Sequence, residues 1–208
     1  MKKIRKKFNY LALMLAVALF LSMGSSVFAL DGTIIFTADS AKQSISGHNM
    51  DVVAFETSGG YVGSCKQFGE EHSTSGTASV TRIPNNYNIA KAAYYFGVVQ
   101  GWEQYLGTTD SRGATLQCII QDLNGSIDEV INNPGEWVPS FVEFAQLCKQ
   151  RSQNALNAYA WESVQVPDSF ECYACQPGDG SQSFILWKGE ANGGLRLKKA
   201  SANTGITG

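Results

Sequence analysis

Basic residues and histidines are scarce in this chain. Among 208 residues there are 16 lysines and arginines against 18 aspartates and glutamates, and His48 and His72 are the only histidines. Binding to a nucleic-acid backbone requires a basic patch, which this scattered and mildly acidic pattern does not supply. Also missing are a glycine-rich phosphate loop after a strand pattern and a pair of carboxylates at a spacing recognisable for acid–base catalysis. We therefore expect no nucleic-acid partner.

An apolar run long enough to span a membrane is missing from the start of the chain as well. Residues 10–21 are apolar, but a transmembrane helix needs about 20 such residues. Five basic residues precede this run and small residues lead up to Ala29, so residues 1–29 are predicted to be a secretory signal peptide, with an uncleaved anchor as the alternative. Its removal leaves 11 basic against 18 acidic residues, a formal net charge of about −7. We expect a secreted protein of the cell surface.

The cysteines are too few for a disulfide-dense mini-protein, and their number is odd. All five follow the predicted signal peptide: Cys65, Cys118, Cys148, Cys172 and Cys175. Five thiols cannot all pair within one chain. The C-x-x-C at residues 172–175 supplies half of a typical structural zinc site, but neither Cys148 nor a histidine stands at a suggestive spacing for the other half. We expect a disulfide or two buried thiols here, and no metal.

Hydrophobic periodicity predicts an α+β fold, with a β-rich part and an inserted helical part from roughly residue 85 to 161. Runs of β-branched and aromatic residues at 33–37, 51–55 and 183–188 predict strands, and the polar stretch 66–79 predicts a surface loop. A short helix is predicted over 89–96, ended by Gly97. A second helix is predicted to begin at Asp110 or Ser111 and to end at Asn124-Gly125, and a third covers about 140–161.

Several stretches, in their order along the chain, carry a resemblance to a known family. They are Cys65 in residues 61–67 (Tyr-Val-Gly-Ser-Cys-Lys-Gln), residues 88–97 (Asn-Ile-Ala-Lys-Ala-Ala-Tyr-Tyr-Phe-Gly) and Gln117 in residues 116–120 (Leu-Gln-Cys-Ile-Ile). The set resembles the thioester domain of Gram-positive cell-wall adhesins, which has an Ile-x-Lys-Ala-Leu-Tyr-Tyr-Gly stretch and an apolar-Gln-x-apolar-apolar motif. Residues 194–205 look like the first strand of a Cna-B or SpaA-like prealbumin domain, which follows thioester domains in these adhesins.

The resemblance implies a function in covalent attachment. Cys65 and Gln117 would condense inside the fold with loss of ammonia, leaving an internal thioester. An amine, for example a lysine on a host or other extracellular protein, would then attack the acyl carbon of Gln117, release the Cys65 thiol and leave a stable amide. No cofactor is needed and nothing turns over, so the resemblance implies an adhesin rather than an enzyme.

The resemblance also implies a domain organisation. Residues 30–188 would form the thioester domain, 189–194 a glycine-rich linker, and 195–208 the first strand of a truncated prealbumin-like domain. The chain then looks like the N-terminal piece of a longer surface protein, whose missing C-terminal part would attach it to the cell wall.

Two other classes of function stay open. The family's cysteine usually follows an aromatic residue or leucine and precedes apolar residues, whereas Ser64 and Lys66 flank Cys65 here. This departure favours a noncovalent binding or spacer module that has lost the thioester. A secreted Cys-His hydrolase would instead use His48 or His72 as the base for Cys65. If the thioester forms, nearby aromatic residues such as Tyr61, Tyr94 or Tyr95 are expected to shield it from water.

Overall fold

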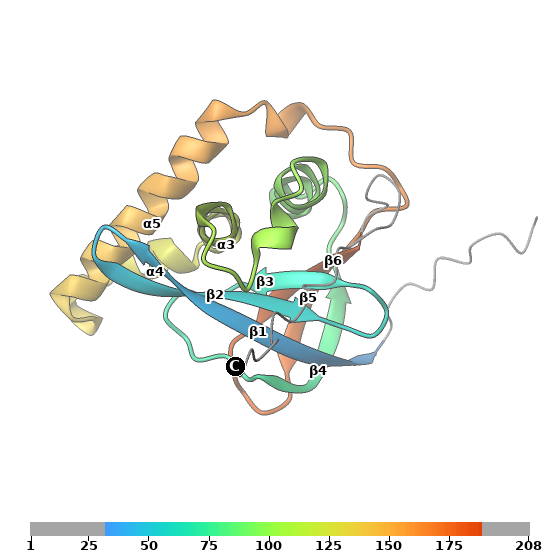
Figure 1. Ribbon diagram of the computed structural model, residues 1–208, viewed down its shortest axis with the longest axis horizontal. Coiled ribbons are helices and arrows are strands. Elements are labelled where there is room, and N and C mark those ends of the chain that lie inside the picture. Colours follow the sequence, from blue (N-terminus) through green and yellow to red (C-terminus); the bar gives the residue numbers. More distant parts are fainter. Residues whose placement is uncertain (1–31, 189–208) are drawn as a thin grey trace, which may run out of the picture.

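A computed structural model describes residues 32–188 of the chain. Six antiparallel strands close into a barrel in the order β1-β2-β3-β6-β5-β4 (Figure 1). The strands are β1 (Thr33–Ile45), β2 (His48–Glu56), β3 (Val62–Cys65), β4 (Ser75–Arg82), β5 (Glu171–Pro177) and β6 (Phe184–Lys188). The predicted signal peptide, the predicted linker and the predicted prealbumin-like strand lie outside the described residues. The predicted α+β class is confirmed.

Alternation of side chains along the strands divides the buried residues into two cores. One lies inside the barrel, where Phe36, Phe55 and Phe184 stack on one another with ring centroids 4.1–5.7 Å apart. The other lies between the barrel wall and the helices, and it includes Trp187 and Ile185. Because successive residues of a strand point to opposite faces, β6 contributes to both cores and is buried on both sides. A barrel of this size is filled by its own side chains.

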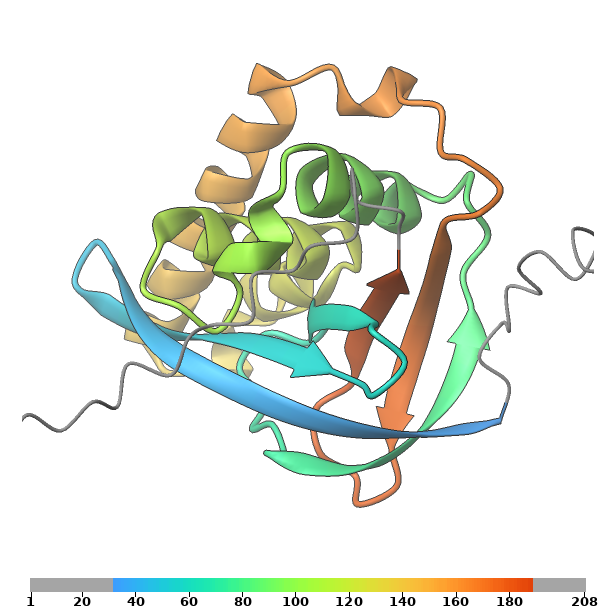
Figure 2. The same cartoon turned by 45° about the vertical axis from the view of Figure 1, so that its right-hand side comes forward.

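The helices lie in the chain between β4 and β5 and cover one side of the barrel (Figure 2). They are α2 (Asn88–Ala92), the π-helix η1 (Ala93–Val99), the 3-10 helix η2 (Trp102–Tyr105), α3 (Ser111–Leu123), α4 (Ser126–Asn132), the 3-10 helix η3 (Pro134–Glu136), α5 (Pro139–Ala158) and the 3-10 helix η4 (Trp161–Ser163). No helix within residues 32–188 has both the length and the apolar character that a membrane crossing requires.

Helix α3 begins and ends where the sequence predicts, because Asp110 caps it and Asn124 closes it. The prediction that Gly97 ends the preceding helix is wrong. The chain continues as a π-helix to Val99, and Gly101, with a left-handed φ of 68°, follows. A side chain at residue 97 would meet the indole of Trp187 at 3.0 Å. The glycine at 97 therefore serves close packing of the helix against β6.

The sequence did not predict two of the strands, β4 and β5, or helix α4. The predicted loop 66–79 is wrong in its second half, because β4 begins at Ser75. This strand is polar because only Ala78 is buried in it, so it carries little apolar periodicity. Strand β5 contains the C-x-x-C, and α4 directly follows the predicted end of α3.

Candidate functional site

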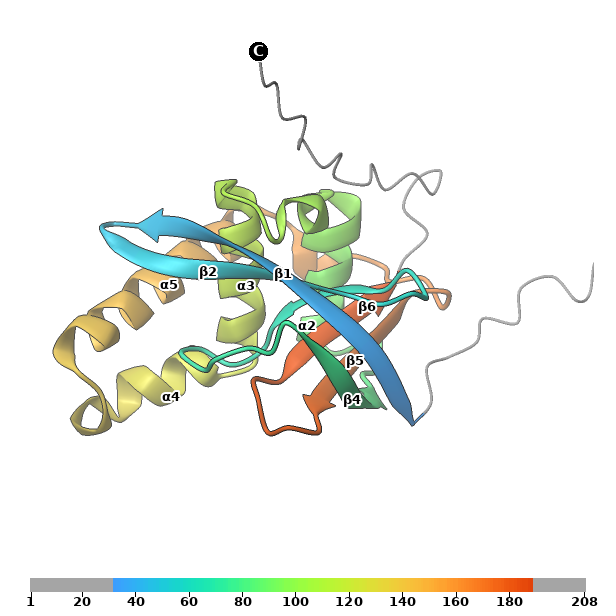
Figure 3. The same ribbon diagram turned by 60° about the horizontal axis from the view of Figure 1, so that its bottom comes forward.

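A pocket of about 470 Å³ opens where one end of the barrel meets the helices. Its walls come from β2, the end of β3, the loop that follows β3, and helices α3 and α5; in Figure 3 the hairpin of β1 and β2 reaches over to α5 on this side. Both predicted site residues, Cys65 and Gln117, line it. The fold thus brings together two residues that are 52 positions apart in the sequence.

Cys65 is the last residue of β3 and is only 2% exposed. It belongs to the core inside the barrel, and its end-of-strand position also places it on the pocket wall. Burial, with a smaller contribution from nearby Asp51, raises the pKa of the Cys65 thiol well above its usual range. The thiol is therefore protonated at neutral pH, unlike the thiolate of a reactive catalytic cysteine.

Gln117 occupies a gap in the hydrogen bonding of the barrel. Strand β3 pairs with β2 only at Phe55 and Glu56, so the edge of β2 before these residues has no partner in β3. The Gln117 side chain takes the place of this missing strand partner. Its Nε2 donates to the Asp51 carbonyl at 2.9 Å, and its Oε1 accepts from the Val53 N–H at 2.9 Å. The buried backbone groups are satisfied in this way, and the amide is held in one orientation.

Ser64 supplies a further contact to the same amide. Because Ser64 precedes Cys65 in the strand, its side chain points to the opposite face, toward α3. Its Oγ lies 3.5 Å from Gln117 Oε1 and is fully buried. The described hydrogen bonds join Gln117 to Ser64 and to β2, and none joins it to the Cys65 sulfur.

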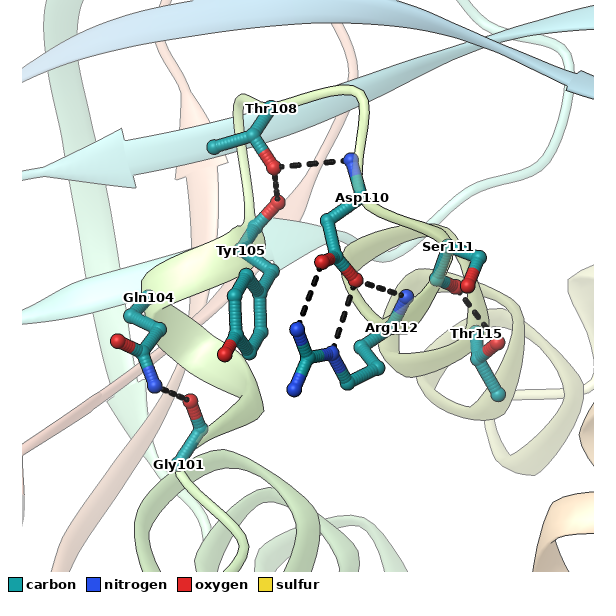
Figure 4. A network of polar contacts seen from close by, with 8 residues as sticks. All are labelled: Gly101, Gln104, Tyr105, Thr108, Asp110, Ser111, Arg112 and Thr115. Carbon is teal, nitrogen blue, oxygen red and sulfur yellow. Dashed lines mark hydrogen bonds and ion pairs between the residues drawn. The ribbon is translucent and has the colours of Figure 1, made fainter.

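A network of polar contacts holds the first turn of α3, the helix that carries Gln117 (Figure 4). Asp110 accepts a hydrogen bond from the Arg112 N–H at 2.9 Å and also forms an ion pair with its guanidinium. That guanidinium stacks on the Tyr105 ring, 3.6 Å from its centroid. Gly113 lies so close to η2 that a Cβ there would be 2.1 Å from the Tyr105 carbonyl oxygen. The helix start is therefore docked tightly on η2.

The remainder of α3 is attached to the loop after β3. Gln121 Nε2 of α3 donates to the Gln67 carbonyl at 2.8 Å, and Ser126 Oγ, at the start of α4, donates to the Lys66 carbonyl at 3.0 Å. These bonds hold the loop and the helix on the same side of the pocket.

The pocket combines negative charge with an aromatic wall. Its titratable side chains are Asp51, Cys65, Glu70, Glu71 and His72, with no lysine or arginine among the described lining residues. Phe68, Phe141 and Phe144 form the aromatic side, with Phe68 5.1–5.2 Å from the other two rings. Within the described residues, the Oε1 of buried Gln121 has no hydrogen-bond partner. Such surroundings suit a cation with an apolar stem.

The aromatic residues expected to shield the thioester are not those that line the pocket. Tyr94 packs on Phe170, and Tyr95 packs on Phe96 and Tyr159. Tyr61 lies inside the barrel. None of these three tyrosines is among the pocket residues, although Tyr61 belongs to the same buried core as Cys65. Phe141 and Phe144 lie within the predicted third helix, and Phe68 lies in the predicted loop 66–79. Local sequence patterns alone do not reveal that all three converge.

The two histidines differ in their relation to Cys65. His72 lines the pocket together with Cys65. His48 is not among the lining residues, and its ring stacks on that of Phe144 with the centroids 5.4 Å apart. A hydrolase would need a thiolate and access of substrate to the sulfur at every turnover. The buried, protonated state of Cys65 disfavours that use.

The other cysteines are separated by the fold. Cys172 belongs to the core under the helices and Cys175 to the core inside the barrel, on opposite faces of β5. They can therefore neither pair with each other nor share a metal ion, and both are buried thiols. Cys118 of α3 and Cys148 of α5 are neighbours, and the Cys148 thiol, together with burial, raises the pKa of Cys118. Within residues 32–188 no cluster of three or more histidine, cysteine or acidic side chains could hold a metal.

Models of known protein families, curated proteins and solved structures were compared with this chain, and none of them matches it.

Proposed function

We propose that this chain is an adhesin module that forms an internal thioester between Cys65 and Gln117 and is then attacked by an amine of an extracellular target. The observation that carries the proposal is the convergence of these two residues on one pocket, with the Gln117 amide immobilised by β2. Ser64, and not Cys65, contacts the amide in this fold, so the reaction requires the Cys65 side chain at the end of β3 to turn from the barrel interior toward Gln117. Once the two groups meet, enforced proximity can replace the very high effective concentration that an unactivated thiol and amide require in order to react. The thioester needs to form only once in each molecule, so a thiol that is mostly protonated is still compatible with this reaction.

The pocket supports a lysine side chain as the attacking amine. The aromatic residues can cover the four methylenes of its stem, and each buried methylene contributes about 0.8 kcal/mol. The carboxylates of Asp51, Glu70 and Glu71 favour the positive charge that develops on the attacking nitrogen. The free acceptor on Gln121 can take one of its N–H groups.

The mass of the intact protein tests the thioester directly. The proposal requires a deficit of one ammonia, which methylamine abolishes while leaving a methylamide on Gln117. Cys65→Ala and Gln117→Ala should each remove the deficit. Cys118→Ala should keep it, because Cys118 is equally buried but lies beside Cys148 and away from the pocket. A wild-type protein of full mass, with Cys65 alkylated, would reject the thioester.

A noncovalent binding module is the second candidate, and the hydrogen bonding of Gln117 favours it. All three contacts of its amide are also satisfied if the residue serves only to close the edge of β2. In that case the same pocket would bind a cationic ligand reversibly. Full sequence mass, together with saturable and reversible binding of a lysine-rich peptide, would support this function over the covalent one.

A further inference from the structure

The oxygen of the Gln117 amide lies between two hydrogen-bond donors that belong to the barrel. The Val53 N–H is 2.9 Å from Oε1, and the Ser64 hydroxyl is 3.5 Å from it. The two donors come from neighbouring strands, β2 and β3. We propose that Val53 N–H and Ser64 Oγ form an oxyanion hole for the Gln117 carbonyl, with Ser64 as the donor that binds more tightly when the oxygen becomes negatively charged. The inference rests on the proposed thioester function.

Both chemical steps place negative charge on this oxygen. In formation, the Cys65 sulfur adds to the Gln117 Cδ, the carbonyl π electrons move to Oε1, the thiol proton passes to the amide nitrogen, and the C–N bond breaks to release ammonia. In capture, the amine nitrogen adds to the same carbon, charge again collects on Oε1, the C–S bond breaks, and the proton from nitrogen goes to sulfur. A donor aimed at Oε1 assists each step.

The two distances suggest different roles for the two donors. The bond from Val53 has the usual length in the resting amide, so it holds the ground state as well as the intermediate. The contact from Ser64 is longer than a normal O–H···O bond, so it contributes little before reaction. Only an interaction that strengthens on the way to the transition state accelerates a reaction. Ser64 meets this condition, because its hydroxyl can move closer as charge develops.

Burial adds to the effect. Ser64 is fully buried and Gln117 is 3% exposed, so water competes little for the oxygen. In a dry site a hydrogen bond to a developing charge is stronger than in solution. The residue that departs from the family's usual pattern before the cysteine would then be a functional replacement and not a sign of lost chemistry.

The test compares Ser64→Ala with Ser64→Thr, which keeps a hydroxyl, and with Ser152→Ala, which removes another fully buried serine hydroxyl in α5. Intact-mass time courses of the full purified chain give the rate of the ammonia deficit after refolding and the rate of its loss in methylamine. Thermal unfolding reports whether each variant keeps its fold.

We expect Ser64→Ala to slow both steps about 10²-fold, as loss of one oxyanion donor does elsewhere. Ser64→Thr should recover most of the rate, and Ser152→Ala should match the wild type. A fully folded Ser64→Ala that never acquires the deficit also supports the role, provided that Ser64→Thr acquires it. Wild-type rates in Ser64→Ala, or equal slowing in Ser64→Thr, would overturn the assignment of Ser64 as an oxyanion donor. In either case an ammonia deficit in the wild-type mass would still support the thioester. A wild type without any deficit would reject the proposed function itself.

Discussion

In the proposed function, Gln117 would join structure and reactivity in a single side chain. Its amide completes the hydrogen bonding of Asp51 and Val53, and the same bonds aim its carbonyl carbon. The unfolding free energy of a variant that keeps the shape and removes the donor measures the structural role.

Gln117→Glu is expected to destabilise the protein by about 1–3 kcal/mol. It places a carboxylate oxygen against the Asp51 carbonyl, where a hydrogen bond is lost in a buried site. Urea unfolding measures the change in the free energy of unfolding. Gln104→Glu is the control, because Gln104 forms a similar bond to the Gly101 carbonyl at the surface and should cost much less. Equal costs at both positions would contradict the buried role of Gln117.

Phe141 is expected to select amines with an apolar stem. Pentylamine should open the thioester about 10–10²-fold faster than methylamine, because its four extra methylenes pack on the aromatic wall at up to about 0.8 kcal/mol each. Phe141→Ala should bring this ratio close to one. The methylamine rate in the same variant controls for damage to the site, and an unchanged ratio would exclude Phe141 from contact with the amine.

The sequence could nominate Cys65 and Gln117 as candidate site residues, which the fold brings to one pocket, but it could not nominate the residues around them. The pairing of Gln117 with β2 depends on where β3 begins, which no local pattern encodes. In the sequence, Ser64 stands out only as a departure from a motif. Because side chains alternate between the two faces of β3, Ser64, and not Cys65, faces α3. Two acidic residues of the pocket, Glu70 and Glu71, follow β3 in a polar stretch that is indistinguishable from an ordinary surface loop.

At the scale of elements, α3 depends on close contact at its first turn. Gly113→Ala is expected to destabilise the protein by about 1–3 kcal/mol, because its Cβ would overlap the Tyr105 carbonyl oxygen and force the helix away from η2. Gly135→Ala is a matched control, since nothing lies within 4 Å of a Cβ there and the change should stay within about 0.5 kcal/mol. Urea midpoints check both values. A neutral Gly113→Ala would mean that α3 is not fixed by this contact.

Helices α3 and α5 carry a pair of thiols suited to cross-linking. In an oxidising medium, Cys118 and Cys148 are expected to form a disulfide that closes a loop of about 30 residues and stabilises the protein by about 3–4 kcal/mol. Peptide mapping without reduction identifies the bond, and unfolding with and without reductant measures its contribution. Cys172 and Cys175 serve as internal controls, because they lie on opposite faces of β5 and should remain free. A Cys172–Cys175 disulfide would contradict the placement of β5.

The helices were easier to predict from sequence than the strands for a physical reason. The limits of α3 follow from capping residues that act locally. Strands β4 and β5 form only because distant residues pair, with Ala78 opposite Pro177 and Arg82 opposite Tyr173. Ala78 is the one fully buried residue of β4, which leaves no alternating pattern to find.

At the scale of the whole molecule, buried acids of high pKa make the fold sensitive to alkali. Burial raises the pKa of Cys175 to about 12 and that of Cys172 further. The pKa of Tyr61 is raised by burial and, to a smaller extent, by the hydrogen bond of Tyr61 to Glu171. Unfolded thiols ionise near pH 8.5 and tyrosine near pH 10. Above those values the unfolded chain loses protons that the fold retains, so stability falls with rising pH.

The expected loss begins near pH 8.5 and is up to about 1.4 kcal/mol per pH unit for each such group, continuing for Cys175 to about pH 12. Urea unfolding between pH 7 and 11 measures the slope. Cys175→Ala should reduce the slope whatever it does to the stability at pH 7. A slope that is identical in this variant would show that Cys175 does not titrate on unfolding.

The attachment of α3 to the loop after β3 has a mechanical consequence. In the proposed function, tension on Gln117 would be shared with Cys65, and so with β3, while the thioester is intact. Once an amine has replaced the sulfur, that covalent route is gone, and a pull on the target reaches the barrel through the bonds of Gln121 and Ser126 to the 66–67 backbone and through the chain itself. Capture would then remove the covalent link between α3 and β3, so that α3 could move away from the barrel under load. The module could extend under flow and absorb energy while the amide to its target holds.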